Sequence, residues 1–206
     1  LNSGAAGGTI TFKDLLNGTQ TLGLTAGTGN IDFDGVVGGA AALGAVTVNS
    51  AGNVTADAAF SAASFRQVAG SGTTTFTGAL ATTAAAAVEV DGTNFDFNST
   101  VNLTLGSLDV DATGTVRFNG VVTTQAAAAG LVTITNGGVL TITAGGDMNL
   151  QGAFLQDGAG TISTAGDITT TNDAITFTDE VTLTGAVALN SGAAGGTITF
   201  KDLLNG

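Results

Sequence analysis

Cysteine, proline, histidine, tryptophan and tyrosine are all absent from the 206 residues of this chain. Without cysteine there is no disulfide framework and no thiolate metal site. Without proline, every strand can donate main-chain hydrogen bonds to both of its neighbours. The lack of histidine, cysteine and tyrosine also removes side chains that commonly carry acid–base and nucleophilic catalysis. We therefore predict no catalytic residues and a protein that is not an enzyme.

Positive charge is also scarce, because four basic residues stand against sixteen acidic ones and leave a net charge of −12. A nucleic-acid-binding protein needs a basic surface, so nucleic acid is excluded as a partner. No apolar run reaches 18 residues, so we predict no helix that spans a membrane. The hydrophobic fraction of 43% favours a folded chain over a disordered one.

What the chain does contain is repetition. Its first eighteen residues, LNSGAAGGTITFKDLLNG, return unchanged as residues 189–206. The offset is 188 residues, so we predict that residues 1–188 form one full repeat and that residues 189–206 start the next. On this interpretation Gly206 marks a cut in a longer repetitive chain, and residues 1–206 are a single continuous segment.

A shorter period lies inside the repeat, as strand-like phrases that end in phenylalanine. Neighbouring phrases are mostly 21 to 23 residues apart. We predict that the longer gaps contain further coils, marked by Ala56, by VLTI (139–142) and by TIST (161–164). The phenylalanines of the phrases are Phe12, Phe33, Phe76, Phe97, Phe118, Phe177 and Phe200.

A unit of this length with two or three short strands cannot bury its own apolar face, whereas stacked units bury a continuous core. We therefore predict an all-β fold, a right-handed parallel β-helix or β-solenoid with about nine coils of ~21 residues per 188-residue repeat. The two copies of the eighteen-residue segment should lie about nine rungs apart, roughly 43 Å at ~4.8 Å per rung.

The alternation of apolar and polar residues predicts which side chains point inward. We expect Phe12, Phe33, Phe76, Phe97 and Phe118 to form an internal ladder beside a second inward column. The outward residues between them place Lys13 beside Asp34 and Asp96 beside Arg117 on neighbouring coils, as cross-strand ion pairs. The second inward column is predicted to contain Ile10, Ile31, Val54, Val116, Ile175 and Ile198.

Two neighbouring coils carry acidic outward residues, because Glu89 and Asp91 are predicted to lie beside Asp109 and Asp111. One interpretation is a calcium site, since calcium prefers clustered oxygen ligands. The other is a solvated acidic patch that is relieved by Arg66 from the preceding coil. The sequence leaves both open, although the glycine-rich calcium-binding repeat is absent. We predict no other cofactor and no other metal site.

Outward threonines also recur, as in TIT at residues 9–11 and 197–199. Such an array is one pattern of ice binding, but it also follows from the ordinary strand preference of threonine. Asp32, Asp96 and Arg117 interrupt the array, which favours the ordinary explanation.

Three stretches show most clearly how strand-like phrases alternate with glycine-rich turns: GTGNIDFDGVVGG (27–39), LGAVTVNSAGNVTADA (43–58) and GGVLTITAGGDMNLQG (137–152). In composition and in this regular spacing the chain resembles the giant bacterial β-strand-repeat surface proteins, similar to filamentous-haemagglutinin-like adhesins. The resemblance covers the whole chain and includes no diagnostic motif. It implies a secreted, rod-like shaft that is extracellular or on the bacterial cell surface, and it transfers no catalytic residue.

Together, the repeats and this resemblance predict a non-catalytic structural segment of a long extracellular filament or cell-surface shaft. Its expected partners are further copies of itself, end to end and also laterally, with any glycan or surface ligand undetermined. The alternative is an adhesin or ice-binding module that uses an outward threonine and aspartate face. That alternative requires one repeated surface pattern, whereas Asp32, Thr55 and Arg117 differ at equivalent positions.

Overall fold

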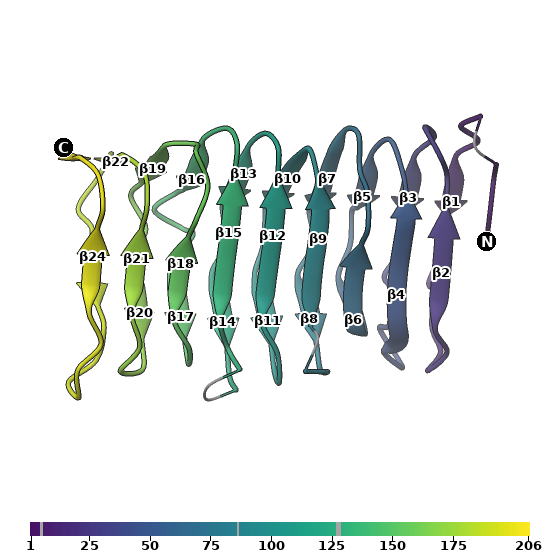
Figure 1. Cartoon of the computed structure of the whole chain (residues 1–206). Coiled ribbons are helices and arrows are strands. Elements are labelled where there is room, and N and C mark those ends of the chain that lie inside the picture. The colour runs from purple at the N-terminus through teal and green to yellow at the C-terminus, as the bar shows by residue number, and fades with distance from the viewer. Residues whose placement is uncertain (5, 86, 127–128) are drawn as a thin grey trace.

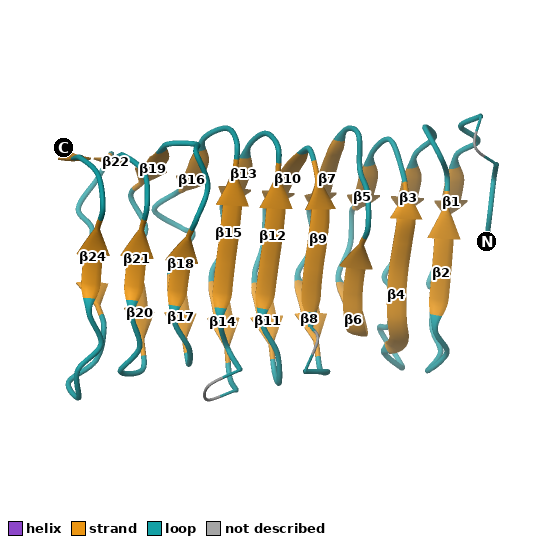
Figure 2. Ribbon diagram, in the orientation of Figure 1, coloured by secondary structure: helices purple, strands orange, loops and turns teal. Residues whose placement is uncertain are grey.

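The chain folds as a rod of stacked coils, shown by a computed structural model that describes residues 1–4, 6–85, 87–126 and 129–206. Those residues form strands and turns without any helix (Figure 1, Figure 2). The strands at the front of Figure 1 run upward, and the chain returns behind them as it advances from right to left. The coil is therefore right-handed, and the predicted fold, an all-β parallel β-helix of about nine turns, is confirmed.

Each turn of the coil has three strand positions, which define three faces of the rod. Face 1 is a ten-stranded parallel sheet, and faces 2 and 3 together form a fifteen-stranded sheet. The second sheet is continuous because β6 (Phe60–Gln67) spans both faces, pairing with β8 (Leu80–Thr82) through its first half and with β9 (Val88–Gly92) through its second. The chain visits face 3, face 1 and face 2 in that order.

The strands of each face follow one another at intervals of one turn. Face 1 contains β1 (Ile10–Phe12), β3 (Ile31–Phe33), β5 (Val54–Ala56), β7 (Thr73–Phe76), β10 (Asn94–Phe97), β13 (Val116–Phe118), β16 (Leu140–Ile142), β19 (Ile162–Thr164), β22 (Val181–Leu183) and β25 (Leu204–Asn205). Face 2 contains the first half of β6, β8, β11 (Val101–Leu103), β14 (Val122–Thr124), β17 (Met148–Leu150), β20 (Ile168–Thr170) and β23 (Leu189–Asn190). Face 3 contains β2 (Leu22–Thr25), β4 (Leu43–Ser50), the second half of β6, β9, β12 (Leu108–Ala112), β15 (Val132–Asn136), β18 (Phe154–Gln156), β21 (Ile175–Phe177) and β24 (Ile198–Phe200).

Side chains alternate between core and surface on every face, as the sequence pattern predicts. In β3, for example, Ile31 and Phe33 are buried while Asp32 between them is partly exposed. Four members of the second inward column are confirmed. Ile10 pairs with Ile31 and Ile31 with Val54, and the same register continues through Thr74 and Phe95 to Val116. One three-residue strand per face is therefore enough to build a continuous core, since each turn covers the apolar side chains of the turn before it.

The phenylalanine ladder on face 1 is confirmed from Phe12 to Phe118. Phe12 and Phe33 stack with ring centroids 5.0 Å apart. Phe97 stacks on Phe76 at 5.8 Å and on Phe118 at 4.9 Å, with the rings within 4° of parallel. The parallel strands impose this geometry, because they hold identical side chains one rung apart.

Ala56 interrupts this ladder, and an unpredicted phenylalanine from face 2 fills the space. Phe60 packs edge-on against Phe33 at 5.3 Å and against Phe76 at 5.8 Å. A small residue on one face is thus compensated by a large residue on the next. The core stays filled without breaking the register of either sheet.

The predicted register of the strand phrases is wrong beyond Phe118. The coils marked by residues 139–142 and 161–164 are present as β16 and β19, but the next strand of face 1 is β22. Phe177 and Phe200 lie instead on face 3, in β21 and β24, where Ile175 pairs with Ile198. Ile175 and Ile198 therefore do not belong to the column of Ile10 and Ile31, and Thr176 is an outward residue of face 3.

The two identical eighteen-residue segments consequently occupy different faces of the rod. Residues Ile10–Phe12 form β1 on face 1, whereas residues Ile198–Phe200 form β24 on face 3. β22 lies eight turns after β1 along face 1, and β24 lies two faces beyond β22. The offset of 188 residues therefore equals eight and two-thirds turns. Each copy of the repeat therefore begins one face earlier around the rod than the preceding copy does.

The amide side chains of Asn136 and Gln156 are fully buried within the later turns. Asn136 donates to the Gly160 carbonyl oxygen at 2.9 Å, and the Gln156 side-chain nitrogen donates to the Asn136 Oδ1 atom at 2.9 Å. The Gln156 Oε1 atom accepts from the backbone nitrogen of Thr178 at 3.0 Å. The alternation in residues 132–136 indicates that Asn136 points inward, but it does not identify its partners. Asn136 and Gln156 therefore supply hydrogen-bond partners to main-chain groups at a corner where three turns meet.

Replacing Gln156 with leucine is expected to lower the free energy of unfolding by about 1–3 kcal/mol, because the buried groups it contacts lose their partners. Urea denaturation followed by circular dichroism measures this change. Gln151→Leu is the matched control, because the Gln151 side chain is exposed; its effect should stay within about 0.5 kcal/mol. Equal stability of the two variants would show that the buried amide network contributes nothing.

Candidate functional site

The surface carries one of the two ion pairs predicted for face 1. Lys13 and Asp34 form a salt bridge with an N–O distance of 2.9 Å, which also raises the pKa of the Lys13 amine. Asp96 and Arg117 do lie at paired positions of β10 and β13. The Arg117 Nε atom, however, donates to the Asn119 side chain at 3.0 Å. The side chain of Arg117 is thus directed along its own strand by a closer acceptor.

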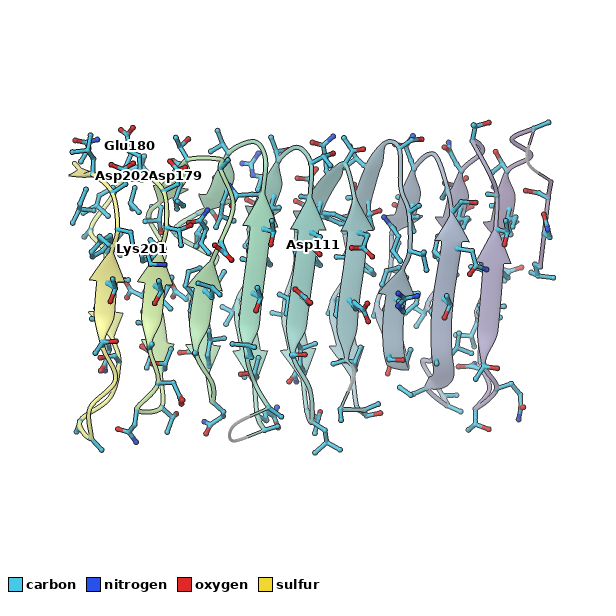
Figure 3. The ribbon with its side chains drawn as sticks, in the orientation of Figure 1. Asp111, Asp179, Glu180, Lys201 and Asp202 are labelled. Atoms are coloured by element: carbon cyan, nitrogen blue, oxygen red, sulfur yellow. The ribbon has the colours of Figure 1, made fainter. Side chains whose placement is uncertain are left out.

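The predicted acidic positions on face 3 are brought together as expected. Asp109 pairs with Glu89 and Asp111 with Asp91 in the register of β9 and β12. Arg66 on β6 forms a salt bridge with Glu89 at 3.2 Å, so the preceding coil does relieve part of this charge. Asp111 lies on the solvent side of β12 in Figure 3. We call Glu89, Asp91, Asp109 and Asp111 the acidic ladder.

Partial burial and mutual repulsion raise the pKa values of two residues of the acidic ladder. The pKa of Asp109 is raised, first by partial burial and then by the charges of Asp111 and Glu89. The pKa of Asp91 is raised by partial burial and by the charges of Asp111 and Glu89. Among the described residues, no three acidic side chains are grouped closely enough to hold a metal ion. The geometry therefore favours the solvated acidic patch over the calcium site.

Acidification from neutral pH is expected to stabilise the fold through the acidic ladder. Because the pKa values of Asp91 and Asp109 are raised by folding, the folded chain binds protons more tightly than the unfolded chain. The free energy of unfolding should thus increase as the pH falls through the raised pKa values. Urea denaturation at several pH values measures this slope.

Asp109→Asn should mimic the protonated state at neutral pH and raise stability by a few tenths of a kcal/mol, since exposed charges are screened. It should also reduce the pH dependence. Asp109→Glu keeps the charge and serves as the control. A fold that weakens on mild acidification in the unmodified chain would contradict this account.

Face 2 has a different character, because its outward residues are uncharged. A shallow polar groove of about 480 Å³ runs along β14, β17 and β20. Its outward side chains include Thr123, Asn149 and Thr169 at the centres of these strands. Hydroxyl and amide groups can bind a neutral polar ligand, but the groove holds no titratable side chain for catalysis.

A second acidic group, which the sequence did not predict, lies at the corner beside the last turn. Asp179 and Glu180 lie there on one turn and Asp202 on the next, at the top of the view in Figure 3, whereas Lys201 lies lower in that view. The Glu180 side chain accepts a hydrogen bond from the Asn205 side chain at 2.6 Å. The corner could not be found from the eighteen-residue repeat, because Asp202 lies on it only in the rotated second copy.

Comparisons with protein-family models, with curated proteins and with solved structures found no match to this chain. The described residues also include no helix long and apolar enough to cross a membrane. The geometry of the coil and its surfaces is therefore the basis for the functional argument.

Proposed function

We propose that this chain is a non-catalytic structural segment of a long repetitive filament or cell-surface shaft in the extracellular space. The proposal is supported chiefly by the contrast between the core and the surface of face 1. Its inward positions are nearly all apolar over ten strands, whereas its outward positions change in charge and size. In order, the outward residues are Thr11, Asp32, Thr55, Thr75, Asp96, Arg117, Thr141, Ser163, Thr182 and Asn205.

A face whose outward side chains change from turn to turn suits a structural spacer better than it suits a binding surface. A binding face would require the same side chains at every turn, so that identical groups meet a repeated ligand. Here the constant feature is the main-chain hydrogen bonding along the axis, together with the stacked core. Both give length and stiffness and leave few extended loops open to proteases. The resemblance to β-strand-repeat surface proteins supports the extracellular location.

The proposal predicts how length depends on the number of repeats. Proteins with one, two and three tandem copies of residues 1–188 should form rods whose length grows by roughly 42 Å per copy, at ~4.8 Å per turn. Electron microscopy of negatively stained molecules measures this increment. Copies that fold into beads separated by flexible joints would contradict a continuous shaft.

A binding module remains the second candidate because of one observation on face 2. Its later outward residues alternate between amide and hydroxyl groups and carry no charge, in the order Asn102, Thr123, Asn149, Thr169 and Asn190. An ice-recrystallisation assay and a glycan array test this face directly. Strong activity in either, lost in an Asn149→Lys variant but kept in a Thr55→Lys control, would replace the shaft as the primary function.

A further inference from the structure

The groove on face 2 lies where two short corners of the coil stand between two long ones. The corners after β17 and β20 have three and four residues (151–153 and 171–174), whereas the corners after β14 and β23 have seven residues each (125–131 and 191–197). In Figure 1 the corner between β23 and β24 accordingly extends further from the strands than the corners after β17 and β20. The recess between the long corners holds the groove of about 480 Å³.

A buried threonine changes the main-chain pairing beneath the groove. One turn earlier, the Gln125 nitrogen donates to the Leu103 carbonyl oxygen at 3.0 Å. The equivalent Gln151 nitrogen instead donates to the Thr124 hydroxyl at 2.9 Å, and this hydroxyl donates to the Gly130 carbonyl oxygen at 2.8 Å. Thr124 is only 1% exposed. The pairing of β14 with β17 is therefore one residue pair shorter than that of β11 with β14.

Two amide side chains of the groove have no hydrogen-bond partner in the described protein. Most asparagine and glutamine side chains are bonded within the coil, as when Asn102 accepts from Gln125 at 2.8 Å. Within the described residues, the side chains of Asn149 and Gln151 make no such bond, and both are exposed and line the groove. Gln20, close to the start of β2, is the one further amide of this kind in the part of the chain that the structure describes. The donor and acceptor atoms of Asn149 and Gln151 are thus available to a ligand.

The chemistry of the groove favours an uncharged ligand that is rich in hydroxyl groups. Primary amides and hydroxyls present both donors and acceptors, and a sugar hydroxyl does the same. The four basic residues of the sequence lie on, or directly after, strands of faces 1 and 3, so none is placed to bind a phosphate, sulfate or carboxylate here. Asp147 and Asp167 stand directly before β17 and β20 and would repel such an anion.

The dimensions of the groove suit a short oligosaccharide. It extends over three turns, which is ~10 Å along the axis at ~4.8 Å per turn. Its volume falls within the range of about 300–1,000 Å³ that is typical of small-molecule sites. Successive sugar residues laid along the axis would each meet polar groups of two columns. These columns are Thr123, Asn149 and Thr169 in the strands, and Gln125, Gln151 and Thr171 at the corner.

We propose that this groove binds a short uncharged oligosaccharide, with the side-chain amides of Asn149 and Gln151 as its main hydrogen-bonding groups. The inference rests on the second candidate function, a binding module on face 2, and confines binding to three turns instead of a repeated face. It is independent of the shaft function, because a ligand held at the surface leaves the stacked core of the rod unchanged.

Saturation-transfer difference NMR on the whole 206-residue chain tests the groove, because the method detects weak binding. The neutral probes are maltotriose, cellotriose, mannotriose, galactotriose and triacetylchitotriose. Trigalacturonate is the anionic control of similar size, and N-acetyl-trialanine amide represents an uncharged polypeptide. The affinity is obtained from the growth of the signal with probe concentration.

The expected result is binding of at least one neutral trisaccharide and no binding of trigalacturonate or of the peptide. Asn149→Leu and Gln151→Leu should each weaken that binding about three- to tenfold, the effect of losing one neutral hydrogen bond. Gln20→Leu is the matched control, because it removes an equally exposed amide outside the groove and should leave the affinity unchanged. Circular dichroism checks that the three variants keep the fold.

An affinity that is unchanged in Asn149→Leu and Gln151→Leu, or reduced equally in Gln20→Leu, would overturn the site. Signals from the peptide alone, from trigalacturonate alone or from no probe would overturn the assignment to an uncharged oligosaccharide. Any of these failures leaves the shaft function to its own test, the length increment of tandem copies. Ice-recrystallisation activity that persists in Gln151→Leu would likewise keep a binding module that uses the whole of face 2.

Discussion

Replacing Phe97 with alanine is expected to lower the free energy of unfolding by about 3–5 kcal/mol, the range for removing a fully buried phenylalanine. Phe97 is 1% exposed and is stacked between Phe76 and Phe118. Its removal opens a cavity in the middle of the rod. The turns above and below cannot collapse into the cavity without breaking their strand registry, so the cost should fall at the upper end of this range.

Urea denaturation followed by circular dichroism measures the loss. Phe12→Ala is the matched control, because Phe12 has the same inward position in the first turn but is only partly buried and stacks on one ring. Its effect should be clearly smaller. Equal effects at the two positions would mean that the phenylalanine ladder is not a continuous core.

Replacing Gly38 with alanine is the second change with a large expected effect, about 2–4 kcal/mol of destabilisation. Gly38 has a φ of 71°, in the region that residues with a side chain rarely adopt. A Cβ atom there would also meet the Ser61 carbonyl oxygen of the next turn and lie 2.9 Å from the Ala42 Cα atom. Both contacts are with backbone, so no side chain can move away to relieve them.

Gly23→Ala provides the control for this prediction. Gly23 lies within β2, and an added Cβ atom would have no neighbour within 4 Å. Because alanine restricts the unfolded chain, this variant should be unchanged or more stable by up to about 1 kcal/mol. In thermal and urea denaturation, Gly38→Ala should therefore lose stability, whereas Gly23→Ala should keep or gain it. Loss of stability in Gly23→Ala comparable to that in Gly38→Ala would contradict the close packing of the corner at Gly38.

The sequence was informative wherever the period is regular. Alternation and a spacing of about 21 residues predicted the stacked coil, the ladder from Phe12 to Phe118 and the neighbours of the acidic ladder. These features depend on local rules, since each strand must bury alternate side chains. Of the two interpretations of the acidic ladder, the geometry favours the solvated patch over the calcium site, because adjacency along a sheet does not make carboxylates converge on a point.

The sequence was misleading where the same phrase fits more than one face. The phrase ITF forms β1 on face 1 and β24 on face 3, because the inward positions of both faces accept isoleucine and phenylalanine. Corner lengths decide which face a phrase reaches, and these vary between residues 118 and 177. Periodicity alone therefore gave the number of turns but not the phase of the repeat.

The central claim is that the chain is a straight coil that advances one strand spacing per turn, and electron–electron distances between paired spin labels test it most directly. Labels at outward positions of face 1, with Thr11 as the common partner of Asp96, Thr141 and Thr182, lie four, six and eight turns apart. The predicted separations are roughly 19, 29 and 38 Å, at ~4.8 Å per turn. Distances that do not increase in this linear series would contradict the solenoid and the shaft function that depends on it.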